Sequence, residues 1–388
     1  MICRLTELAG CQATSACVRS FSKKRPGNQT HPRAALAAKL ALAGGSVLVF
    51  LLLFEIVLRF CGYGNLEIYQ PDAKLYWKLK PNQDCFTKVD HKPVHVNSLG
   101  TRGPEFVAAK PAGTLRILSL GDSRTFGWGL TDEETYSRKL EKSLGDYFKN
   151  GSAGSPLPAA GGSGEDGTHG VTRPTIQRVE VINAGVNAWS FAQMDVFFRD
   201  AAREWQPDIV ILAEANLWTQ FSEKNSPEFV EKFMSRVRLK NLLRRSAIYH
   251  FLIEVKLAAF YARHRTKFIP VDPKQDALFK EQQQSDPDAV FRDAIAGVCR
   301  TAQSNHIRPV LMFLPMLDDL QSTNQSRVLR AKQTIAAESK VPLCDVTRDV
   351  APGAKALYLD ADPVHFNAQG NEIIAQRLFE TVTNLVVR

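Results

Sequence analysis

The stretch Leu115-Arg116-Ile117-Leu118-Ser119-Leu120-Gly121-Asp122-Ser123 decides the fold class. Its first six residues form a short, mostly apolar run, which predicts a buried strand over 115–120. A Gly-Asp-Ser turn follows the strand, and Glu134–Phe148 is predicted as a helix. A strand, a turn and a helix in this order form the first unit of a pattern that continues to the C-terminus.

Downstream of this unit, short apolar runs keep alternating with amphipathic segments. Four further strands are predicted, at Val179–Ile182, Ile209–Leu212, Pro309–Leu314 and Val341–Val346. Helices are predicted between and after them, at Phe191–Trp205, Ala289–Ser304, Ser326–Ser339 and Ala368–Val386. Repeated strand–helix units predict the α/β class, with a central, mostly parallel five-stranded sheet between two layers of helices.

Two insertions interrupt this pattern. Residues 149–174 are rich in Gly, Ser and Pro and are predicted to form a flexible loop. Residues 224–285 are charged and helical, which favours a lid or cap. The chain is predicted to begin with a basic tail over 1–33 and a membrane-spanning segment over 34–61. A stalk with an N-terminal extension of short strands follows over 62–113, and the α/β domain occupies 114–388.

The N-terminal region predicts a membrane anchor. Ala34–Leu58 is a run of 25 mostly apolar residues, and Leu40–Phe54 carries no charge. About 20 apolar residues suffice for a helix to cross a bilayer. Because the basic excess precedes this run, we expect a cytoplasmic N-terminus and an extracytoplasmic domain. A cleaved signal peptide, a mitochondrial targeting tail and a buried core helix are the alternatives.

Charge and cysteine usage exclude several classes of protein. The chain has 388 residues and a net charge of +9, but residues 1–39 contain seven basic residues and one acidic residue. The remainder is nearly balanced, so no nucleic-acid partner is expected. The sequence contains no Cys-x-x-Cys pair, Walker loop or His-Glu-x-x-His motif. Cys85, Cys299 and Cys344 leave two possibilities open, one disulfide or buried thiols.

Polar blocks lie where the predicted parallel sheet gathers functional groups, beyond the carboxyl ends of its strands. Gly121–Ser123 follows the first strand, Asn183–Asn187 the second and Glu214–Asn216 the third. Asp362–His365 precedes the last helix. We therefore expect all four blocks at one edge of the sheet.

Together these blocks supply what acyl transfer requires. Ser123 is the candidate nucleophile, His365 the base that accepts its proton, and Asp362 the carboxylate that orients the imidazole. The candidate oxyanion-hole donors are the backbone N–H groups of Ser123 and Gly185 and the side-chain amide of Asn216. The alternative is structural, because Ser and Asp cap helices and Gly and Asn occupy turns.

The four blocks resemble those of the SGNH, or GDSL-like, hydrolases. Val96–Gly103 and Gly121–Gly129 resemble the membrane-anchored bacterial branch of that family. The resemblance implies a three-layer α/β/α fold, the triad Ser123, Asp362 and His365, and neither a metal nor an organic cofactor. The third block departs from the family pattern Gly-x-Asn-Asp, because it contains Glu214 and Leu217 on either side of the donor Asn.

The sequence therefore predicts a membrane-tethered, extracytoplasmic serine esterase that forms an acyl-Ser123 intermediate. The expected substrate is an ester on a glycan or lipid of the cell envelope. An O-acyltransferase with the same triad is the first alternative, and a non-catalytic envelope binding or assembly protein is the second. Trp128, Trp189 and Trp218 follow the first three blocks and are candidates either for lining a substrate pocket or for core packing.

Overall fold

The computed structural model describes residues 32–151, 176–214, 225–263, 287–321, 326–360 and 362–387. The chain divides into two compact units, residues 1–53 and 54–388. In the first unit, the described residues belong to helix α1 (Pro32–Phe60). An 18-residue window of α1 within Arg33–Phe60 has a mean hydropathy of 2.4, so the helix is long and apolar enough to cross a membrane, a test that a signal sequence also passes.

A five-stranded parallel sheet forms the centre of the second unit. Its strands are β5 (Thr114–Gly121), β6 (Arg178–Gly185), β7 (Ile209–Leu212), β8 (Arg308–Phe313) and β9 (Leu343–Asp345). Their order across the sheet is β6-β5-β7-β8-β9, and every neighbouring pair is parallel. All eight residues of β5 are buried, which explains why this strand appears in the sequence as an apolar run.

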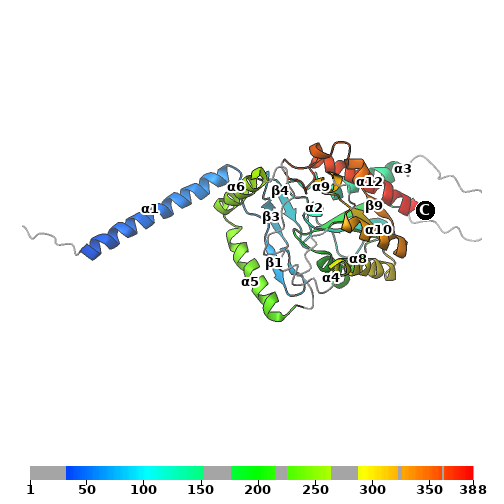
Figure 1. Cartoon of the computed structure of the whole chain (residues 1–388), viewed down its shortest axis with the longest axis horizontal. Coiled ribbons are helices and arrows are strands. Elements are labelled where there is room, and N and C mark those ends of the chain that lie inside the picture. Colours follow the sequence, from blue (N-terminus) through cyan, green and yellow to red (C-terminus); the bar gives the residue numbers. More distant parts are fainter. Residues whose placement is uncertain are drawn as a thin grey trace, which may run out of the picture. The chain divides into compact units, whose positions relative to one another are not determined.

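Helices cover both faces of the sheet, as the sequence predicts (Figure 1). On one face α3 (Tyr136–Gly151) and α12 (Ala368–Val387) pack against Ile117 and Ile211. On the other face α4 (Phe191–Asp200), α8 (Pro287–Ser304) and α10 (Arg327–Ser339) pack around Leu118 and Leu212. Alternate residues of a strand point to opposite faces, so β5 and β7 contribute to both cores.

Two antiparallel hairpins precede the sheet. They consist of β1 (Tyr69–Asp72) with β2 (Tyr76–Leu79), and β3 (Gln83–Phe86) with β4 (Pro93–Val96). These are the short strands expected within 62–113, and they bury Tyr76, Trp77 and Val96 in the same core as α4. The N-terminal extension is therefore part of the hydrophobic core of the second unit.

The region 224–285 is helical where the structure describes it. Helices α5 (Pro227–Leu243) and α6 (Ala247–Arg263) occupy it, and α5 packs against β1 and β2. Glu55 accepts hydrogen bonds from the backbone N–H groups of Ala247 and Ile248, both at the start of α6. Residues 264–286 lie outside the described residues, as does most of the 149–174 insertion.

Several predicted elements differ in extent from the observed ones. The strand predicted over 179–182 continues to Gly185, and the helix predicted over 134–148 spans Tyr136–Gly151. The helix predicted over 191–205 ends at Asp200 and is followed by a 3₁₀ turn, η1 (Ala202–Trp205). The last strand is shorter than 341–346, because Lys340 has a positive φ of 54° and Pro342 has no N–H for the sheet. The remaining short elements are α2 (Ser123–Phe126), α9 (Leu317–Gln321), α11 (Thr347–Val350) and η2 (Ala354–Leu357).

The cysteines that the structure describes are free thiols. Cys85, Cys299 and Cys344 are buried and Cys61 is exposed. Burial raises the pKa of the Cys299 and Cys344 thiols to about 11, which keeps them protonated at neutral pH. Of the two possibilities that the sequence leaves open, the structure has buried thiols.

Candidate active site

Ser123 is the first residue of α2, directly beyond the carboxyl end of β5. Asp122 caps the helix, because its side chain accepts a hydrogen bond from the N–H of Arg124 at 2.9 Å. The capping position is thus occupied by Asp122, which leaves the Ser123 hydroxyl available. Since β5 lies between β6 and β7, α2 begins at the point where the strand order reverses, which is where open α/β sheets bind ligands.

The structure brings Ser123, His365 and Asp362 together. Ser123 Oγ lies 2.8 Å from His365 Nε2, and His365 Nδ1 lies 2.7 Å from Asp362 Oδ2. The other carboxylate oxygen, Oδ1, accepts the backbone N–H groups of Val364 and His365 at 2.8 and 3.2 Å. Both oxygens of Asp362 are therefore engaged, which fixes the carboxylate relative to the imidazole.

This arrangement determines the histidine tautomer. An ionised carboxylate only accepts hydrogen bonds, so the contact with Asp362 requires a proton on Nδ1 of His365. In the neutral imidazole Nε2 is then an acceptor, and it faces the Ser123 hydroxyl. Burial alone would raise the pKa of Asp362, but the His365 charge and three hydrogen bonds outweigh it and lower that pKa below its ordinary value.

The predicted oxyanion donors have different environments. Gly185 is the last residue of β6, and its N–H donates to Asn183 Oδ1 at 3.0 Å. The Ser123 N–H has no acceptor within the part of the chain that the structure describes. Asn216, the third predicted donor, and Leu217 lie outside the described residues.

Gly185 has a clear packing role next to the nucleophile. A Cβ at this position would lie 2.2 Å from the backbone nitrogen of Phe126 and 2.7 Å from the carbonyl carbon of Thr125. The end of β6 therefore contacts the backbone of α2 directly. Asn183 adds a hydrogen bond from Nδ2 to the carbonyl of Thr125 at 2.8 Å.

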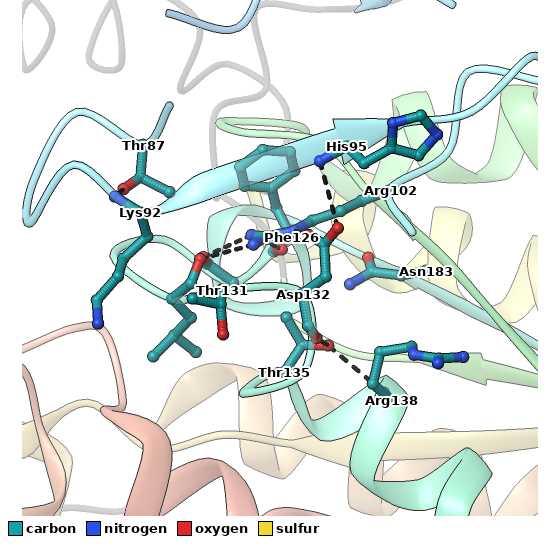
Figure 2. A network of polar contacts seen from close by, with 12 residues as sticks. Thr87, Lys92, His95, Arg102, Phe126, Thr131, Asp132, Thr135, Arg138 and Asn183 are labelled. Carbon is teal, nitrogen blue, oxygen red and sulfur yellow. Dashed lines mark hydrogen bonds and ion pairs between the residues drawn. The ribbon is translucent and has the colours of Figure 1, made fainter. Parts of the chain in front are cut away.

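Arg102 holds the loop that follows α2. Its guanidinium donates to the carbonyl oxygens of Phe126 and Gly127, both at 2.7 Å, and of Leu130 at 2.6 Å. Its Nε donates to Asp132 at 2.6 Å (Figure 2). The backbone N–H of Arg102 also donates to the carbonyl of Asn183. One buried side chain thus joins the N-terminal extension to the loop beside Ser123.

Glu214, the departure in the third block, takes part in a buried ion pair. It is 2% exposed, and its Oε1 lies 2.7 Å from Lys332 Nζ. The Lys332 ammonium also donates to the carbonyls of Ala213 and Met312, at the ends of β7 and β8. A cation from α10 therefore balances the Glu214 carboxylate.

Three side chains near the site are missed by reasoning from the sequence: Arg102, Lys332 and, as a direct neighbour of the base, Trp128. The indole of Trp128 stacks on the His365 imidazole with centroids 5.4 Å apart. Trp189 is fully buried and donates to the carbonyl of Trp77, so its role is core packing. Trp218 lies outside the described residues. The sequence does offer a signal for Arg102, because this arginine lies within the 96–103 block that carries the family resemblance.

Among the described residues, no cluster of three His, Cys, Asp or Glu side chains is arranged to hold a metal ion. Comparison with family models and with curated proteins finds no match. Solved structures do match. A protein from Desulfitobacterium hafniense assigned to the G-D-S-L lipolytic family has 14% identity and a TM-score of 0.38, over 69% of this chain and 98% of that one.

Two esterases are also among the similar structures. The psychrotrophic esterase EstA from Pseudoalteromonas has 12% identity and a TM-score of 0.38, over 71% of this chain and 100% of that one. An acetylxylan esterase from Geobacillus stearothermophilus, in a catalytic mutant form, has 12% identity and a TM-score of 0.40, over 70% of this chain and 94% of that one.

Replacing Arg102 by Leu is expected to lower the free energy of unfolding by about 3 kcal/mol, because three buried carbonyls lose their donor. Urea denaturation measures this cost. Arg203→Leu is the control, since Arg203 is exposed in η1 and forms no ion pair among the described residues. Equal stability of the two variants would show that Arg102 does not hold the loop.

Replacing Gly185 by Ala is expected to destabilise the chain by about 1–3 kcal/mol and to displace α2, because the new Cβ meets its backbone. Gly145→Ala on α3 is the matched control, since a Cβ there has open space. That control should be neutral or stabilising by up to about 1 kcal/mol. Thermal unfolding of both variants compares them, and a neutral Gly185→Ala would contradict the close packing.

Proposed function

We propose that this chain is a serine esterase of the SGNH type that acts through an acyl-Ser123 intermediate. The observation that carries the proposal is the chain of two hydrogen bonds from Ser123 Oγ through the His365 imidazole to Asp362. These residues are 242 and 3 positions apart in sequence, and the fold assembles them beyond the carboxyl end of β5. A helix cap or a turn residue requires no such alignment.

In the first half of the reaction, His365 Nε2 takes the Ser123 proton while Oγ attacks the carbonyl carbon of the ester. The carbonyl oxygen becomes the oxyanion of a tetrahedral intermediate. Its collapse breaks the bond to the alcohol oxygen, and the imidazolium returns its proton to that oxygen. The products of this half are a free alcohol and acyl-Ser123, with His365 neutral again.

In the second half, water replaces the alcohol. His365 Nε2 removes a proton from water, the hydroxide oxygen attacks the acyl carbon, and the collapse of the intermediate returns the proton to Ser123 Oγ. The released product is a carboxylic acid. Asp362 stays ionised throughout and stabilises the imidazolium, which agrees with the lowered pKa of its carboxyl.

For the oxyanion, the N–H of Ser123 is the best placed donor, because it belongs to the first turn of α2 and has no acceptor among the described residues. We retain Gly185 and Asn216 as the other proposed donors. For Gly185 this role requires its N–H to leave Asn183 Oδ1, so its contribution depends on a shift at the end of β6.

We place the enzyme at a membrane, with the N-terminus cytoplasmic and the catalytic unit on the extracytoplasmic side, acting on an ester of an envelope glycan or lipid. The length and composition of α1 and the basic residues before it support this placement. The ion pair of Glu214 with Lys332 weakens the non-catalytic alternative, since Lys332 neutralises the Glu214 charge that helped to motivate it. Transfer to a sugar hydroxyl instead of water remains a variant of the same mechanism.

Fluorophosphonate labelling of the full chain in detergent is expected to add one adduct, on Ser123. The full chain is used because Glu55 caps α6. Ser123→Ala should lose the adduct, and hydrolysis of para-nitrophenyl acetate should fall by on the order of a thousandfold or more. Intact mass and initial rates measure the two effects. Absence of labelling on folded wild-type chain would refute the esterase, and adding alcohols during turnover separates transfer from hydrolysis.

Activity is expected to fall on acidification before the chain unfolds. Protonation of His365 removes the Nε2 acceptor, whereas Asp362 stays ionised to a lower pH than an ordinary aspartate. Since the folded pKa of Asp362 is depressed, its contribution to stability is complete above about pH 3.9 and is lost as the pH falls through the folded value. Labelling rates and circular dichroism between about pH 8 and about pH 4 test this. A labelling rate independent of pH would argue against a histidine base.

A further inference from the structure

A cavity of about 240 Å³ lies between the N-terminal extension, the segment after β6 and helix α5. Trp77 from β2, Phe233 and Val237 from α5 form part of its apolar wall. This volume is below the roughly 300–1,000 Å³ of sites for drug-sized ligands. The cavity therefore suits a single small group and does not accommodate a long acyl chain.

Contacts connect this cavity to the triad. The ammonium of Lys88, which lines the cavity, lies 4.6 Å from the centroid of the Trp128 ring. The same ring stacks on the His365 imidazole. Asn187 and Ala188, also in the lining, come directly after the end of β6 at Gly185. A group held in the cavity would therefore lie beside an ester bond presented to Ser123.

Asn187 belongs to the lining of this cavity and has a buried, unpaired acceptor. Its Nδ2 donates to Glu67 Oε1 at 3.2 Å and to the Tyr69 hydroxyl at 3.0 Å. A carboxylate cannot donate, so these contacts fix which end of the amide is Oδ1. Asn187 is 7% exposed, and its Oδ1 has no hydrogen-bond partner within the described part of the chain. A buried acceptor without a partner destabilises the protein, and a ligand hydroxyl that donates to it would remove that cost.

Arg244 also belongs to the lining and has a buried, unpaired donor. Its Nη1 lies 2.9 Å from Glu67 Oε1 and 2.8 Å from the Glu67 carbonyl, and the guanidinium lies over the Tyr69 ring. Its Nε is buried and has no acceptor among the residues that the structure describes. Two residues of the lining thus each have one buried polar atom without a partner among the described residues, an acceptor on Asn187 and a donor on Arg244.

Positive charge exceeds negative charge around the cavity. Lys88 and Arg244 both pair with Glu67, which is 1% exposed. Lys240 adds a third cation and forms no ion pair among the described residues. Burial lowers the pKa of Lys88 to about 8, and Glu67 partly opposes this effect. Burial and the neighbouring cations Arg244, Arg236 and Lys256 also lower the pKa of Lys240. An anion in the cavity would relieve this repulsion.

We propose that the cavity binds an acidic sugar residue, one small hydroxylated ring carrying a carboxylate or a phosphate, as the part of the ester substrate next to the scissile bond. The anion neutralises the excess charge of Lys88, Lys240 and Arg244. With a rotation of the Asn187 and Arg244 side chains toward the occupant, an acceptor oxygen of the ring or its acid group satisfies Arg244 Nε and a ring hydroxyl donates to Asn187 Oδ1. The proposal rests on the proposed function and specifies its substrate class.

Isothermal titration calorimetry of the full wild-type chain in detergent tests the proposal with three probes: glucuronic acid, glucose 6-phosphate and neutral glucose. At least one acidic probe is expected to bind about tenfold or more tightly than glucose, and the two acids distinguish a carboxylate from a phosphate. Failure of both acids to bind, or glucose binding as tightly as the acids, would overturn it.

Two lysines on α5 supply a matched pair of variants. Lys240→Gln is expected to weaken binding of the preferred acid about tenfold, whereas Lys232→Gln, exposed on the same helix and absent from the cavity lining, should not change it. Equal effects of the two would indicate a nonspecific charge effect and contradict the proposal. Fluorophosphonate labelling separates the two hypotheses: labelling without acid binding refutes the cavity assignment alone, and acid binding without labelling refutes the esterase alone.

Discussion

Close packing between the end of β6 and the backbone of α2 is the constraint on which the candidate active site of this molecule depends. Gly185 lies where any side chain would overlap Phe126, so the first turn after β5 can approach its neighbouring strand. That approach fixes the direction of Ser123 toward His365. Asn183 and Arg102 then secure the same turn by hydrogen bonds to its carbonyl oxygens.

The N-terminal extension also stabilises the turn that follows β5. Arg102 belongs to the segment after β4, yet its guanidinium satisfies carbonyls of the loop beside the nucleophile. The hairpin β1–β2 and helix α5 bound the cavity, and Glu67 gathers Lys88, Arg244 and Tyr69 around one buried carboxylate. The extension therefore shapes both the position of the nucleophile and the surface next to it.

Most of the α/β fold could be predicted from the sequence, because β5 and β7 are buried on both faces; β5 appears as a mostly apolar run and β7 as an uninterrupted one. The meeting of Ser123, His365 and Asp362 could be predicted because Ser123 follows a strand and the other two residues precede a helix. The ion pair of Glu214 with Lys332 could not be predicted from the sequence, since these residues are 118 positions apart and meet only after α10 packs on the sheet. The direction of the Gly185 N–H could not be predicted either, because it depends on the rotamer of Asn183.

The histidine and its carboxylate lie three residues apart in one turn, and two backbone N–H groups bind the same carboxylate. They therefore move together, whereas the nucleophile belongs to a separate part of the chain, 242 positions away. Any displacement of the loop before α12 would carry base and orienting group away as a unit. Such a displacement would change the distance from Ser123 to His365, while the contact with Asp362 would keep the imidazole in the same tautomer.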